Sequence, residues 1–167
     1  MKVSAIVYLT QTGSTAEYAQ LLSQRTGLPA YSLQDALLKL DKAQPVLFMS
    51  WVMGGRLVDY KKAARRLNIV CCSASCLNPM PGQADLIKNA SDIPDDMPCF
   101  TLPGAYRPDR LHGVQKLVMA LITKLLAQKM IRGEDEGQRQ MREVLTKGGS
   151  FVEEENLNEI CSRIEEI

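Results

Sequence analysis

The sequence predicts an α/β fold in which helices cover both faces of an open, five-stranded parallel sheet. Five short segments have the character of buried strands, at residues 3–9, 30–33, 46–49, 69–75 and 99–102. Segments with helical spacing of apolar residues separate these strands, and the connections are short. This alternation predicts a doubly wound sheet, because neighbouring parallel strands need a crossover that a helix supplies.

The first half of the chain contributes two helices and a central strand. The first helix is predicted over residues 16–25, since Gly27 and Pro29 follow it as helix-ending residues. A brief helix is predicted over residues 34–42. The run at residues 46–49 contains no polar side chain, which favours a strand that is buried on both faces.

The second half continues the same alternation. Residues 50–56 are predicted to form a loop, and residues 57–67 form an amphipathic helix with lysines and arginines toward water. A proline-rich loop is expected over residues 76–82, followed by a looser helix through Ile87.

A long helix is predicted to begin near Asp109, because a broad apolar stripe follows it. We expect it to pack on the sheet as the fifth helix; a helix that lies on a membrane surface is the alternative. Two further helices are predicted over residues 138–145 and 154–164. Residues 133–167 would then form a C-terminal helical extension.

Composition favours one domain, spanning residues 1–167. The chain has 167 residues and 46% hydrophobic residues, which is enough for one sizeable core. Its formal net charge of +1 provides no basic field for nucleic acid. No apolar stretch approaches the ~20 residues that span a bilayer, and the N-terminus lacks a leader pattern, so we expect a cytoplasmic protein with reduced cysteines.

The segment between the first strand and the first helix predicts an anion site. The first N–H groups of a helix have no partner inside it, and the helix dipole favours negative charge there. Hydroxyl groups add donors, and a glycine permits a tight backbone. Neither the P-loop motif nor the dinucleotide motif is present, so we expect one phosphate monoester; a capped helix without a ligand is the alternative. The predicted phosphate-binding residues are Thr10, Gln11, Thr12, Gly13, Ser14 and Thr15.

This segment resembles the phosphate loop of the flavodoxin family, which has the form Ser/Thr-x-Thr-Gly-x-Thr. Thr10, Thr12, Gly13 and Thr15 fill its four defining positions. The resemblance implies a flavodoxin-like sheet of order 2-1-3-4-5 and FMN as cofactor. In that order the crevice opens at the carboxyl ends of strands 1 and 3. The net charge of +1 departs from the usual acidity of flavodoxins.

The resemblance also implies two loops around the flavin ring. Trp51 is expected to stack on the ring, with a core anchor as the alternative, while Gly54 and Gly55 would provide a flexible peptide. The residues of the first loop are Ser50, Trp51, Val52, Met53, Gly54 and Gly55. Backbone N–H groups of the second loop would bind the ring edge, and its residues are Ser75, Cys76, Leu77 and Asn78.

No metal site is expected. Cys71 and Cys72 are adjacent in a strand and point to opposite faces. Cys76 has no C-x-x-C partner, and His112 is the single histidine, so neither a zinc site nor an iron–sulfur site is predicted.

The segment after the last strand resembles the flavodoxin-domain branch that contains menaquinone-dependent protoporphyrinogen dehydrogenases. Its aromatic and basic side chains could bind an acidic planar substrate or face a redox partner; surface charge at the start of a helix is the alternative. These residues are Tyr106, Arg107, Arg110 and His112. The leading expectation is an FMN-binding redox protein that transfers electrons through the flavin. The alternatives are an FMN-dependent oxidoreductase acting on a quinone or porphyrinogen, and a flavin-free interaction module.

Overall fold

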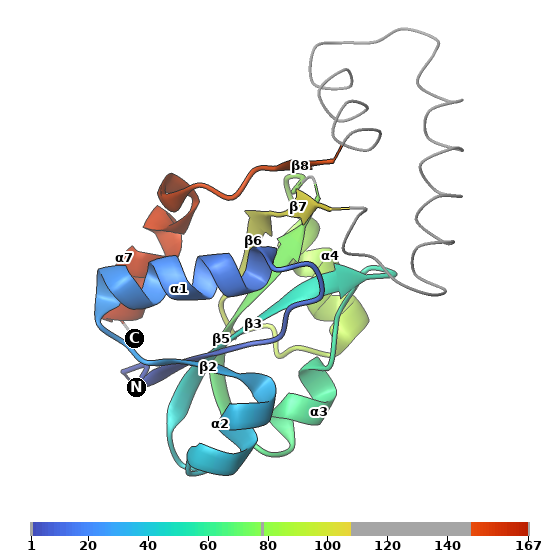
Figure 1. The fold of residues 1–167 in the computed structure, drawn as a ribbon. Helices are drawn as coiled ribbons and strands as arrows, with labels where there is room; N and C mark the ends of the chain where they lie inside the picture. The colour runs from blue at the N-terminus through green and yellow to red at the C-terminus, as the bar shows by residue number, and fades with distance from the viewer. Residues whose placement is uncertain (1, 78, 108–147, 167) are drawn as a thin grey trace, which may run out of the picture.

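The computed structural model describes residues 2–77, 79–107 and 148–166, and it contains the predicted sheet (Figure 1). Five parallel strands lie in the order β2-β1-β3-β5-β6. These strands are β2 (Ala30–Ser32), β1 (Ala5–Tyr8), β3 (Pro45–Met53), β5 (Asn68–Cys76) and β6 (Cys99–Pro103). The predicted order 2-1-3-4-5 is confirmed, because β4 is a short antiparallel strand beside β3 and lies outside the parallel series.

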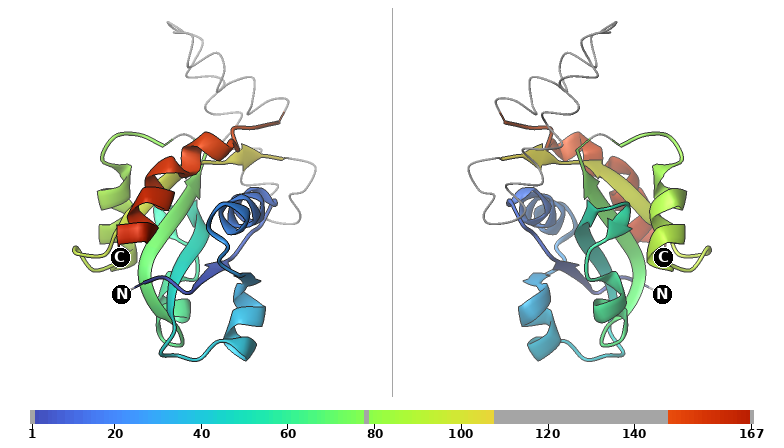
Figure 2. Two further views of the ribbon diagram at one scale, coloured as in Figure 1. Left: turned by 90° about the vertical axis from the view of Figure 1, so that its left-hand side faces the viewer. Right: turned by 90° about the vertical axis from the view of Figure 1, so that its right-hand side faces the viewer.

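Helices cover both faces of this sheet (Figures 1 and 2). On one face, α2 (Leu33–Lys39), α3 (Tyr60–Ala64) and α4 (Gln83–Ser91) bury a core around the Phe48 ring. On the other, α1 (Ser14–Thr26) and α7 (Asn158–Glu166) bury a second core around Leu47 and Met49. The predicted burial of β3 on both faces is confirmed.

In the described part of the chain, α7 packs beside α1. A short 3₁₀ helix, η2 (Glu154–Leu157), leads into α7, which confirms the helical region predicted over residues 154–164. Leu157, Ile160 and Ile164 are buried against the α1 face of the sheet. The long helix predicted to begin near Asp109 and the helix predicted over residues 138–145 lie outside the described residues.

The prediction of a loop over residues 50–56 is wrong. The strand β3 continues to Met53, and the chain then turns back as β4 (Arg56–Leu57). Gly54 and Gly55 have φ angles of 58° and 78°, which suit a tight two-residue hairpin turn. The buried Ser50 hydroxyl donates to the Val58 carbonyl at 3.0 Å, so the strand can contain a polar residue. The hairpin also shortens the helix predicted over residues 57–67.

After β6 the chain forms a second, two-stranded antiparallel ribbon of β7 (Ala105–Tyr106) and β8 (Gly149–Ser150). Gly104 connects β6 to this ribbon and lies close to β5: its N–H donates to the Cys76 carbonyl at 2.6 Å. A Cβ atom at Gly104 would approach that carbonyl oxygen to 3.2 Å, so a larger residue would push the strands apart. Among the described helices, none combines the length and apolarity that crossing a membrane requires.

Candidate phosphate site

The phosphate loop follows β1 and ends at Gly13, the N-cap of α1. Gly13 has φ 104° and ψ −20°, a conformation that L-residues rarely adopt. Its N–H donates to the Thr10 hydroxyl at 3.0 Å, and its carbonyl accepts the first helical bond, from Glu17 N at 3.0 Å. The N–H groups of residues 14–16 precede that bond and have no partner within their helix. They are therefore the donors that an anion would meet.

Thr15 joins this loop to the end of β5. Its hydroxyl donates to the Ser75 hydroxyl at 3.3 Å, and Thr15 and Ser75 are only 1% and 5% exposed. Two of the three segments predicted to form the site therefore meet. The Thr15 hydroxyl therefore links the loop to the sheet. The group of Thr15 that faces an anion would be its backbone N–H.

Trp51 lies on the same face of the sheet as Thr15. It pairs in register with Ser75, and neighbouring residues in register project to the same face. The side chain is partly exposed and, among the described residues, belongs to neither buried core. Trp51 therefore lies at the carboxyl edge of the sheet near the phosphate loop, and its stacking on a flavin ring stays a prediction.

The other residues of that predicted loop are dispersed. Ser50 is buried and Val52 packs against the core containing Phe48, on the face opposite Trp51. Met53 is exposed, as are Gly54 and Gly55 at the hairpin tip. The hairpin turn alone explains why these two positions are glycine.

The end of β5 and the residues that follow it provide no reactive thiol. Burial raises the pKa of the Cys76 thiol to about 11, so the group is protonated at neutral pH and is a poor nucleophile. The Cys76 carbonyl is occupied by Gly104. Leu77 is partly buried, while Asn78 lies outside the described residues. Within the described ranges, no three His, Cys, Asp or Glu side chains gather as metal ligands would.

Arg107 contacts the phosphate loop, which the sequence did not predict. Its Nη1 donates to the Thr12 carbonyl at 3.2 Å, and its Nη2 donates to both Glu17 carboxylate oxygens at 2.9 and 2.8 Å. The Arg107 guanidinium is therefore bonded within the chain, and its predicted role toward a substrate or redox partner stays a prediction. Arg110 and His112 lie outside the described residues, as does the Tyr106 side chain.

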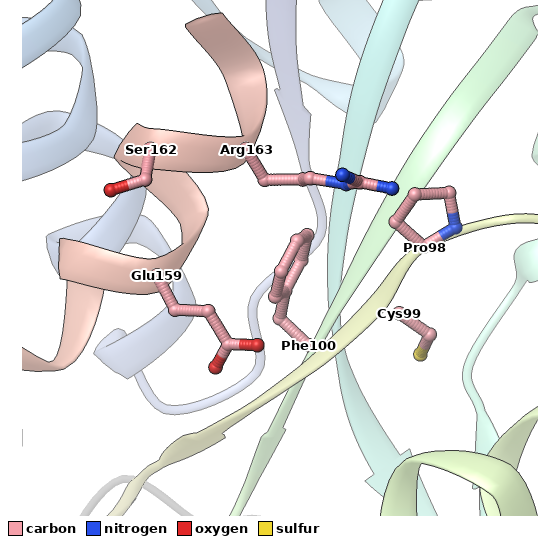
Figure 3. Close-up of a pocket in the computed structure, with 6 residues that line it drawn as sticks. All are labelled: Pro98, Cys99, Phe100, Glu159, Ser162 and Arg163. Atoms are coloured by element: carbon pink, nitrogen blue, oxygen red, sulfur yellow. The ribbon is translucent and has the colours of Figure 1, made fainter. Parts of the chain in front are cut away.

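A hollow of about 560 Å³ lies far from this site, between the start of β6 and α7 (Figure 3). Its lining residues are Pro98, Cys99, Phe100, Glu159, Ser162 and Arg163. Pro98 and Cys99 are at the amino end of β6, whereas the phosphate loop is at the carboxyl end of the parallel sheet. This hollow is therefore separate from the candidate site.

Comparisons with known proteins assign no family. No protein-family model matches the sequence, and no curated protein does. Among solved structures, the chain is similar to a Bacillus subtilis protein described as a candidate phosphosugar isomerase, with 12% identity and a TM-score of 0.30. The match covers 87% of this chain and 46% of that one, so the chain spans less than half of its length. A TM-score of 0.30 is too low to carry a functional inference.

Proposed function

We propose that this chain binds FMN and acts as a flavodoxin-like redox protein that transfers electrons through the flavin. The observation that carries the proposal is the juxtaposition of a phosphate loop with an aromatic side chain. The loop closes α1 at its N-terminus, and Trp51 lies on the same face and edge of the sheet. Open parallel sheets bind ligands at this edge, where the strand order reverses.

The residues fit one phosphate and one ring. Backbone N–H groups of residues 14–16 and the dipole of α1 favour a phosphate, and the hydroxyls of Thr10 and Thr12 lie in the same short loop. The glycine-rich motif that holds the pyrophosphate of a dinucleotide is absent from the sequence, which favours FMN over FAD. FMN would supply the electron-transfer chemistry, and the protein would bind and orient it.

Replacing Thr12 with alanine is expected to weaken FMN binding by about 1–3 kcal/mol, because a charged acceptor loses a hydrogen-bond donor. Riboflavin, which lacks the phosphate, should bind the wild-type protein less tightly than FMN does. Titration of the flavin-free protein with both ligands measures these affinities. Thr26→Ala, at the other end of α1, provides the matched control and should bind FMN normally. Equal affinity for FMN and riboflavin would contradict a phosphate site.

The fluorescence of Trp51 should fall strongly when FMN binds, because a flavin next to an indole quenches its emission. Trp51 is the single tryptophan, so the signal has no background from elsewhere. The measurement is a titration of flavin-free protein with FMN, followed by emission. If emission stays constant at saturation, Trp51 lies away from the ring.

The visible absorption spectrum of the purified protein separates the main proposal from the flavin-free alternative. A bound flavin gives absorption bands that a simple interaction module lacks. Steady-state turnover of a porphyrinogen or a menaquinone analogue by the flavin-loaded protein would instead indicate an oxidoreductase.

A further inference from the structure

We infer that Arg107 is a positioning residue that holds the phosphate loop in its anion-binding conformation and offsets the charge of Glu17. The loop-holding part stands on the contacts alone, while the effect on FMN rests on the proposed function. Three hydrogen bonds from one guanidinium reach both the loop and the first turns of α1. Arg107 is therefore placed to act on the site through its neighbours.

The first step concerns a single peptide group. The Thr12 carbonyl and the Gly13 N–H belong to one planar, trans peptide and point in opposite directions. Arg107 donates to that carbonyl at 3.2 Å, and the Thr10 hydroxyl accepts that N–H at 3.0 Å. Both ends of the peptide are thus held immediately before α1. The bond from Arg107 keeps the Thr12 carbonyl oxygen turned away from the anion site. In the opposite orientation, this oxygen would repel the anion.

The second step concerns charge. Glu17 is in the first turn of α1, the end at which a phosphate would bind. An unpaired carboxylate there would oppose a phosphate electrostatically. The Arg107 side chain is 19% exposed, and its Nη2 donates charge-assisted hydrogen bonds to both carboxylate oxygens. The pair therefore reduces the repulsion that Glu17 would exert on a phosphate.

The third step concerns how Arg107 reaches the loop, which lies 95 positions earlier in the chain. Arg107 directly follows β7, and β7 is held by β8. The Tyr18 hydroxyl of α1 donates to the carbonyls of Pro103 and Phe151 at 2.7 and 3.2 Å. These two hydrogen bonds hold the ribbon against α1 on both of its strands. The backbone position of Arg107, next to the ribbon, is therefore fixed relative to α1.

The test compares Arg107→Met with Arg25→Met. Arg25 also links α1 to a distant segment, donating to the Glu154 carbonyl and the Asn158 side chain at 3.0 Å each. In flavin-free protein, Arg107→Met should speed amide hydrogen exchange at Gly13 and Glu17 by about tenfold or more, whereas Arg25→Met should not, because the N–H groups of Gly13 and Glu17 donate to the Thr10 hydroxyl and the Gly13 carbonyl. This readout needs no ligand, so it decides the loop-holding role even if the wild-type protein binds no flavin.

Flavin affinity provides the second readout. Arg107→Met should weaken FMN binding by about tenfold to a hundredfold and leave riboflavin affinity unchanged, because only the phosphate meets the altered charge. Glu17→Gln should bind FMN at least as tightly as wild type, and adding it to Arg107→Met should restore part of the loss. Unchanged exchange at Gly13 and Glu17, or an equal loss of affinity for FMN and riboflavin, would overturn the inference.

Discussion

Replacing Ile160 with alanine is expected to lower the free energy of unfolding by about 2–5 kcal/mol, because it removes a buried side chain and leaves a cavity. Ile160 is fully buried on α7 and packs with Leu157 against the core beneath α1. The prediction tests whether the packing of α7 on the sheet contributes to the stability of the fold. Urea unfolding followed by circular dichroism measures the change.

Glu159→Ala is the matched control for this prediction. Glu159 is the preceding residue on the same helix but is exposed. Its replacement should change stability by less than about 0.5 kcal/mol, as surface substitutions usually do. If both variants unfold at the same denaturant concentration, α7 does not pack on the sheet in solution.

Raising the pH above 9 is expected to unfold the protein progressively, because four thiols are protected from ionisation only in the folded state. Burial raises the pKa of Cys71 to about 12 and the pKa of both Cys76 and Cys99 to about 11, and it raises the pKa of Cys72 well above the ordinary value of 9.0. These thiols are protonated in both states below pH 9. Their stabilising contribution is therefore complete there.

Between pH 9 and the raised values, the unfolded chain loses thiol protons while the folded protein retains them. Each such thiol then removes about 1.4 kcal/mol of stability per pH unit. Urea unfolding at a series of pH values from 7 to 11 measures the slope. Cys71→Ala should be less stable at pH 7 but should have a shallower slope above pH 9. An unchanged slope in that variant would contradict this explanation.

The five parallel strands were predictable because each carries its own local signal, and the resemblance of the phosphate loop to that of flavodoxins supplied their order. The apolar run of β3 and the glycine after the first helix can be read from neighbouring residues. The hairpin was not predictable in this way. Ser50 and the glycine pair look like loop residues, and the strand depends on a bond from Ser50 to Val58 that exists only after the chain turns back.

The place of α7 was also beyond local reasoning. The apolar spacing near Glu154 predicts a helix, but the sequence does not say which face of the sheet that helix covers. In the structure, Leu157, Ile160 and Ile164 pack in the core beneath α1. Where an amphipathic helix packs is a property of the assembled core, which propensity and periodicity do not describe.

In the candidate site, too, one part could be predicted from the sequence and another could not. The phosphate loop is contiguous in sequence, so its residue types and its position after a strand were sufficient to identify it. The contacts that hold it in place are remote: Thr15 meets Ser75, and Glu17 meets Arg107. An arginine and an acidic residue 90 positions apart give no signal of pairing in a single sequence.

The β7–β8 ribbon links the register of two short strands to the shape of the phosphate loop. Ala105 pairs with Ser150 and Tyr106 with Gly149, and Arg107 is the next residue after this pair. A shift of one residue in this register would move Arg107 along the ribbon and away from the Thr12 carbonyl and the Glu17 carboxylate. The ribbon therefore sets how far the Arg107 guanidinium reaches.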